Sequence, residues 1–125
     1  MSAETLVFVY GTLKRGGENH SFLAGQTFVG EAHTVPGFRL YELDGYPGLV
    51  DYPDDRDGVT GELWSVDSAT LSRLDELEGV EVGLYRRQRI PLQSPFERSA
   101  AETYLYARSV AGRREIGSSW PRPPS

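Results

Sequence analysis

A short apolar strand that ends abruptly at a glycine-containing turn is the feature that most constrains how this chain folds. Residues 6–10 are apolar, β-branched or aromatic, which is typical of a buried strand. Residues 11–17 are polar and rich in glycine. Glycine lets the main chain approach a ligand closely, and N–H groups just beyond a strand can bind an anion or a carbonyl oxygen. The pattern therefore predicts that a small polar molecule is bound where this strand ends.

The length and composition indicate one domain that needs no covalent cross-links. A chain of 125 residues is typical of one domain, and it buries about two thirds of its unfolded surface. It has no cysteine, which excludes disulfides, thiolate metal sites and a cysteine nucleophile and agrees with a cytoplasmic location. No long apolar run and no signal-peptide pattern is present, so we expect no membrane association.

The charge balance argues against a nucleic-acid partner. The formal net charge is −5, with acidic residues spread along the chain. Arg86, Arg87 and Arg89 are grouped on a predicted strand, where a solvated edge is the simpler interpretation. Binding of DNA or RNA is therefore not expected.

The apolar pattern predicts short strands and one helix. The helix covers residues 69–78, begins after a cap at Asp67 and Ser68, and ends before Gly79. Short strands, one helix and no alternation of strand and helix predict the α+β class, with a curved, barrel-like sheet. Strands are predicted at 5–10, 26–35, 37–43, 49–50, 59–66, 85–92 and 102–108, and a helical turn at 19–23.

Two segments are predicted to lie outside the core. We expect a domain at residues 1–111 and a tail at 112–125 that lies loosely on the surface or frays, with Trp120 as its one candidate anchor. Residues 52–58 are predicted to form an exposed connection. The aspartates in it resemble part of a calcium loop, but the glycine and the distal glutamate are misplaced, which favours a solvated loop.

Glu78 stands on the apolar face of the predicted helix. At about 100° per residue, Glu78 falls in the sector defined by Leu71, Leu74 and Leu77. A buried carboxylate there lowers the stability of the fold unless it is paired, protonated or has a role in function. Burial, the end of the helix and the neighbouring Asp75 are each expected to raise its pKa, as a general base or acid near neutral pH requires.

Other interpretations of these residues stay open or fail. A frayed last turn would leave Glu78 in water, and pairing with Arg87 or a tyrosine would make it purely structural. The glycines at 11 and 16 lack the Lys-Ser/Thr of a phosphate-binding loop. His20 and His33 are the only histidines, so no metal site is predicted, and His20 is interpreted as a hydrogen-bonding residue at a helix start.

Several segments together resemble a known family. The sequence FVYGTLKRG at 8–16, followed by Asn19-His20, resembles the opening signature of the gamma-glutamylcyclotransferase-like superfamily. That group includes gamma-glutamylamine cyclotransferases, AIG2-like proteins and the deprotecting enzyme of butirosin biosynthesis. Segments 45–49, 61–67, 74–79 and 84–87 resemble later motifs of the family, in the same order.

The resemblance implies a fold and a set of site residues. The fold is a small mixed-strand β-barrel with flanking helices. The family's catalytic glutamate corresponds to Glu78. The substrate-binding residues correspond to Tyr10, Gly11, Thr12 and Leu13, which act chiefly through backbone N–H groups, and Tyr106 matches a strand tyrosine beside the pocket.

The resemblance also implies a reaction without metal or cofactor. The α-amine of a gamma-glutamyl amine or amide attacks its own side-chain carbonyl, a lyase-type cyclisation that gives 5-oxoproline and a free amine. Glu78 would carry out both proton transfers, and the N–H groups at 11–13 would bind a carboxylate or an oxyanion. The alternative is a module of the same fold that binds a small metabolite without turnover, or a protein-interaction role for the tail.

Overall fold

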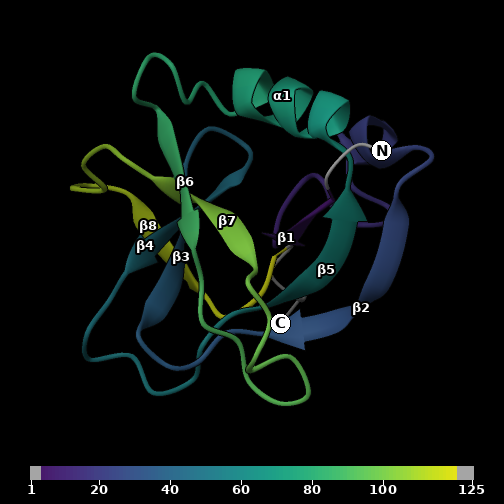
Figure 1. Ribbon diagram of the computed structural model, residues 1–125. Coiled ribbons are helices and arrows are strands. Elements are labelled where there is room, and N and C mark those ends of the chain that lie inside the picture. Colours follow the sequence, from purple (N-terminus) through teal and green to yellow (C-terminus); the bar gives the residue numbers. More distant parts are fainter. Residues whose placement is uncertain (1–3, 121–125) are drawn as a thin grey trace.

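The computed structural model describes residues 4–120 and shows a strongly curved mixed sheet with one helix across its end (Figure 1). The elements are β1 (Thr5–Val9), the 3₁₀-helix η1 (His20–Leu23), β2 (Thr27–His33), β3 (Phe38–Glu42), β4 (Pro47–Asp51), β5 (Thr60–Val66), α1 (Ser68–Leu77), β6 (Tyr85–Arg89), β7 (Glu102–Tyr106) and β8 (Arg114–Gly117). The predicted α+β class is confirmed.

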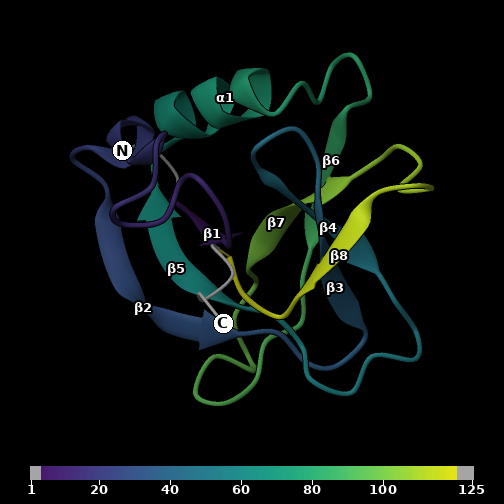
Figure 2. The same cartoon turned by 180° about the vertical axis from the view of Figure 1, so that it is seen from behind.

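The sheet curves without closing into a barrel. Its strand order is β2-β5-β1-β7-β4-β3-β8, and β6 pairs with β7 beside this path. Within residues 4–120 the end strands β2 and β8 do not pair with each other. Viewed from behind, β3, β4 and β8 lie on the opposite side of the molecule from β2 and β5 (Figure 2). The expected barrel is therefore an open, wrapped sheet.

Strand β7 is the point at which the sheet divides. Its start pairs in parallel with β1, at Val7 and Glu102, whereas its end pairs in parallel with β4, at Leu49 and Leu105. Strands β1 and β4 then leave in different directions, toward β5 and β3 respectively. Strands that diverge in this way leave backbone groups in need of partners and open space at the end of β1.

The hydroxyl of Tyr10 supplies the missing partners at this division. It donates to the carbonyl oxygen of Tyr104 at 2.6 Å and accepts from the N–H of Leu49 at 3.3 Å. Tyr10 is buried, so neither backbone group has ready access to water. One side chain thus joins the end of β1 to both β7 and β4.

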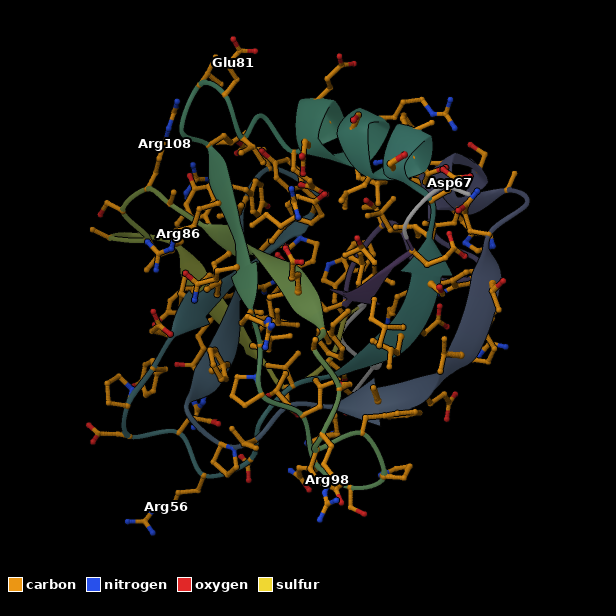
Figure 3. All side chains as sticks on the ribbon, in the orientation of Figure 1. Arg56, Asp67, Glu81, Arg86, Arg98 and Arg108 are labelled. Atoms are coloured by element: carbon orange, nitrogen blue, oxygen red, sulfur yellow. The ribbon has the colours of Figure 1, made fainter. Side chains whose placement is uncertain are left out.

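Both faces of β1 are buried, which explains its unbroken apolar sequence. Phe8 and Tyr10 face a core enclosed by the curved sheet, whereas Val7 and Val9 face a second core beneath α1. Leu74 is fully buried in that second core. The helix begins as predicted, with the carboxylate of Asp67 (Figure 3) accepting from the N–H of Thr70 at 2.7 Å.

The expected exposed connection at 52–58 contains a buried carboxylate. Asp54 and Asp57 are exposed as predicted, but Asp55 is buried and accepts from Arg39 Nε at 2.7 Å and from the N–H groups of Gly37 and Gly58. Burial alone would raise the pKa of Asp55, but these hydrogen bonds outweigh it and hold the pKa well below its usual range. Asp55 therefore anchors this connection to β3.

The predicted surface tail contains a strand. Residues Arg114–Gly117 form β8 and pair with β3, so the expectation of a loose tail is wrong for them. Ile116 and Trp120 pack on the core, and the carbonyl oxygen of Ser118 accepts from the N–H of Thr60 at 2.8 Å. Pairing with β3 satisfies a strand edge that would otherwise be open. Residues 121–125 of the predicted tail lie outside the described residues.

Neither helix in residues 4–120 has the length and apolar content needed to cross a membrane.

Replacing Tyr10 by phenylalanine is expected to destabilise the fold by about 1–3 kcal/mol, because the buried carbonyl of Tyr104 and N–H of Leu49 lose their partner. Urea unfolding measures this change. Tyr41→Phe is the matched control, because the Tyr41 hydroxyl bonds to no residue among 4–120. Equal stability of the Tyr10→Phe variant and the parent protein would show that the division of the sheet needs no such partner.

Candidate active site

A small cavity lies at the end of β1, beneath the last turn of α1. Its volume is about 40 Å³, and it adjoins an outer cavity of about 420 Å³. The inner cavity is lined by Phe8, Val9, Tyr10, Gly11, Thr12, Leu13, Tyr46, Pro47, Glu78, Tyr85 and Tyr104. The two cavities share Thr12, Tyr46, Glu78 and Tyr85. The predicted loop and Glu78, which are far apart in sequence, therefore meet at one site.

Glu78 caps the end of α1 and presents its carboxyl group to this cavity. Gly79 follows with a φ of +63°, a conformation that favours glycine and ends the helix there. Glu78 is half-buried, and within residues 4–120 its side chain makes no hydrogen bond or ion pair. Burial raises its pKa to about 7. Its carboxyl group can therefore both accept and donate a proton near neutral pH.

Asp75 does not act on Glu78 in the way the sequence suggested. Its carboxylate accepts from Arg87 Nε at 2.9 Å and from the hydroxyl of Tyr104 at 2.7 Å. Arg87 also donates to Glu102, at 2.6 Å. Burial alone raises the pKa of Glu78, so the like-charge contribution expected from Asp75 is absent. The same pairing leaves Arg87 unavailable to Glu78.

The loop after β1 exposes a group of free N–H donors. The N–H groups of Gly11, Thr12 and Leu13 donate to no acceptor in the described part of the chain. The carbonyls of these residues and the hydroxyl of Thr12 accept hydrogen bonds from elsewhere in the protein. Asn19 donates to the carbonyl and the hydroxyl of Thr12, and His20 Nδ1 donates to the carbonyl of Leu13 at 3.0 Å. The loop is therefore fixed, while its donors remain free to bind a ligand.

Gly11 is required by a close approach of the main chain. A Cβ atom at this position would lie 2.7 Å from Pro47 Cγ, a distance that real Cβ atoms essentially never show. The glycine therefore lets the loop pack directly against the start of β4.

Three of the four tyrosines that line the inner cavity use their hydroxyl protons within the protein. Tyr10 donates to the carbonyl of Tyr104, Tyr85 to the carbonyl of Pro47 at 3.0 Å, and Tyr104 to Asp75. Burial raises the pKa of each of these three hydroxyls, which therefore stay protonated. Because their acceptors carry no hydrogen, these three tyrosines can offer a ligand only lone pairs.

Tyr106 is absent from the residues that line the cavity. Its ring packs edge-on against Tyr85, with ring centres 5.4 Å apart. Tyr104, two residues earlier on the same face of the strand, lines the cavity. The alternation of side chains along a strand puts Tyr104 and Tyr106 on the same face. It does not predict which of them reaches the cavity, because that depends on how far β1 extends along β7. Tyr46 and Pro47 come from the Tyr-Pro segment that the sequence had marked as a motif.

Comparison with known proteins places this chain in a family. A sequence profile for the family described as gamma-glutamyl cyclotransferase, AIG2-like, matches residues 7–122. The chain belongs to this family. A Vibrio cholerae protein provisionally named gamma-glutamylcyclotransferase is 45% identical over 101 residues, which are 81% of this chain and 81% of that protein. The predicted family membership is confirmed.

Two further relatives extend the comparison. The crystal structure of an AIG2-like protein from Mus musculus has a TM-score of 0.73 and 31% identity, covering 83% of this chain and 78% of that one. A gamma-L-glutamyl-butirosin B gamma-glutamyl cyclotransferase of Niallia circulans is 38% identical over 72 residues, 58% of this chain and 44% of that enzyme. These names support gamma-glutamyl cyclotransferase activity in general.

Replacing Glu78 by glutamine is expected to stabilise the protein above neutral pH. The pKa of Glu78 is raised from 4.5 to about 7, so the folded state holds its proton longer than the unfolded chain and loses stability as pH rises through that window. At about pH 8 the Glu78→Gln variant should be more stable by about 1–3 kcal/mol, and at about pH 4 the difference should vanish.

Thermal unfolding at both pH values measures this difference. Glu76→Gln is the matched control, because Glu76 is exposed on the same helix and should show no such change. A Glu78→Gln variant that tracks the parent protein at every pH would mean that the Glu78 carboxylate is fully solvated.

Proposed function

We propose that this protein cyclises a gamma-glutamyl amine or amide to 5-oxoproline and releases the free amine. The observation that carries the proposal is the polarity of the inner cavity. Its lining combines the N–H groups of Gly11, Thr12 and Leu13, which have no acceptor within residues 4–120, with the carboxyl of Glu78 and the lone pairs of Tyr85 and Tyr104. The family and the names of its members support the same activity.

A glutamyl head group matches the donors and acceptors that line the inner cavity. It carries anionic or carbonyl oxygens, which need donors, and an α-amine, which needs acceptors. The head group would enter the inner cavity of about 40 Å³ and extend into the outer cavity of about 420 Å³, which leaves room for the amine that departs. Net charge and size favour a small-molecule substrate over a nucleic acid. The absence of cysteine keeps the cytoplasm as the proposed location.

Glu78 would carry both proton transfers. In its ionised form it takes a proton from the α-amine, whose nitrogen attacks the gamma-carbonyl carbon and forms the ring C–N bond. The tetrahedral intermediate places negative charge on the former carbonyl oxygen, which the loop N–H groups can stabilise. Protonated Glu78 then donates to the leaving nitrogen, and the original amide C–N bond breaks. A pKa of about 7 suits a group that serves both steps.

The chemistry needs no further group because the two reactants belong to one molecule. Ring closure inside a bound substrate has effective molarities of about 10⁵ M or more when the geometry is right. We expect the hydrogen-bonded loop at 11–13 and the hydrogen-bonded tyrosines around the cavity to hold the substrate in that geometry. The cyclisation is thus proposed to proceed without metal or cofactor.

The purified protein is expected to release 5-oxoproline from at least one member of a panel of gamma-glutamyl amines and amides, measured by mass spectrometry. Glu78→Gln should lower kcat by about 10²-fold to 10⁴-fold, because it removes the proton carrier while it preserves shape. This variant should still bind the substrate without cleaving it, and calorimetry measures that binding.

Glu76→Gln is the matched control and should keep full activity. If the panel gives no product while a gamma-glutamyl compound still raises Tm, the protein is a binding module and the catalytic proposal is wrong. Full turnover by Glu78→Gln would assign the proton transfers to another group.

A further inference from the structure

A charged cluster behind the cavity connects α1 to β6 and β7. Asp75 of α1 accepts from Arg87 of β6 and from Tyr104 of β7, and Arg87 also bonds Glu102 of β7. The side chains of Asp75, Arg87 and Glu102 are each between a quarter and a third exposed, so the cluster is partly shielded from water. Its neighbour Arg86 points outward from β6 (Figure 3) and bonds Gln88 and Asp51 in exposed contacts.

Asp75 is close enough to Glu78 for its charge to affect the ionisation of the Glu78 carboxyl group. Residues three apart on a helix are neighbours on its surface, so Asp75 lies one turn behind Glu78. A bare carboxylate at that place would oppose the ionisation of Glu78. Arg87 meets Asp75 with two nitrogens, at 2.9 and 3.3 Å, so Asp75 is not a bare carboxylate.

The described residues that line the two cavities carry no cation that could take over this role. Glu78 shares the inner cavity with Tyr10, Tyr46, Tyr85 and Tyr104. Glu18 and Asp44 line the outer cavity and carry the same sign as Glu78, and Asp44 is paired at 3.1 Å with Arg113. Among the described residues that line either cavity, none is a lysine or an arginine.

We propose that Arg87 is a positioning residue of this site: by pairing with Asp75 it masks the negative charge behind Glu78, so that Glu78 can release its proton near neutral pH. The carboxylate of Asp75, held by Arg87, also fixes the hydroxyl of Tyr104 at the cavity wall. The catalytic meaning of this arrangement rests on the proposed function. The charge coupling itself does not.

The test is an NMR titration of the Glu78 carboxyl carbon in protein labelled with ¹³C-glutamate, with the signal assigned through Glu78→Gln. In Arg87→Gln the titration midpoint of Glu78 should rise by about half a unit to one unit, because Asp75 is left bare. In Asp75→Asn it should fall, because the carboxylate one turn before Glu78 is lost while the Arg87 cation, still paired with Glu102, remains. The double variant should return close to the parent value.

Two controls separate charge from structure. Arg87→Lys keeps the cation and should leave the midpoint near that of the parent protein, and Arg86→Gln should have no effect. A residue with a merely structural role would lower Tm without opposite shifts in the two single variants. If Arg87→Gln does not fold, the downward shift in Asp75→Asn still tests the coupling.

Three results would overturn the inference. The first is a Glu78 midpoint that neither Arg87→Gln nor Asp75→Asn moves. The second is a shift in the same direction in both variants. The third is a double variant that stays as high as Arg87→Gln, which would assign the effect to Glu102. Because the titration needs no substrate, the predicted pattern in a protein that releases no 5-oxoproline would refute the proposed function and leave this inference standing.

Discussion

The bonds of the Tyr10 hydroxyl hold the site open at the one place where the sheet divides. Strands β1 and β4 both pair with β7 and then part, which leaves the carbonyl of Tyr104 and the N–H of Leu49 to be satisfied by a side chain. Tyr10 does this from the last position before the loop. The strands can therefore diverge without unpaired backbone groups, and the space between them becomes the cavity.

The polarity of the cavity follows from the same arrangement. Tyr10, Tyr85 and Tyr104, three of the tyrosines that line the cavity, donate their protons to acceptors within the protein and so cannot donate to a ligand. The loop at 11–13 does the opposite, because its carbonyls are used and its N–H groups have no acceptor within residues 4–120. Glu78 adds a carboxyl group that has no partner in the same described residues. A fixed separation of donors and acceptors is what recognition of an amino-acid head group requires.

The sequence predicted the parts of this site that depend on local pattern. The strand before Gly11, the helix capped by Asp67 and the inward position of Glu78 all follow from the spacing of apolar residues over one or two turns. Contacts between distant segments were not predictable in this way. The buried Asp55, strand β8, the choice of Tyr104 over Tyr106 and the pairing of Asp75 with Arg87 depend on which strands become neighbours. A tyrosine at the division of a sheet can be identified only once that division is known.

The account is tested most directly by a crystal structure of the Glu78→Gln variant with an uncleaved gamma-glutamyl amine. We expect the head group in the inner cavity, with a carboxylate or carbonyl oxygen within hydrogen-bond distance of at least two of the N–H groups of Gly11, Thr12 and Leu13. The α-amine should lie within hydrogen-bond distance of the side chain at position 78. A ligand bound outside this cavity, or bound with its amine toward the loop, would contradict the account.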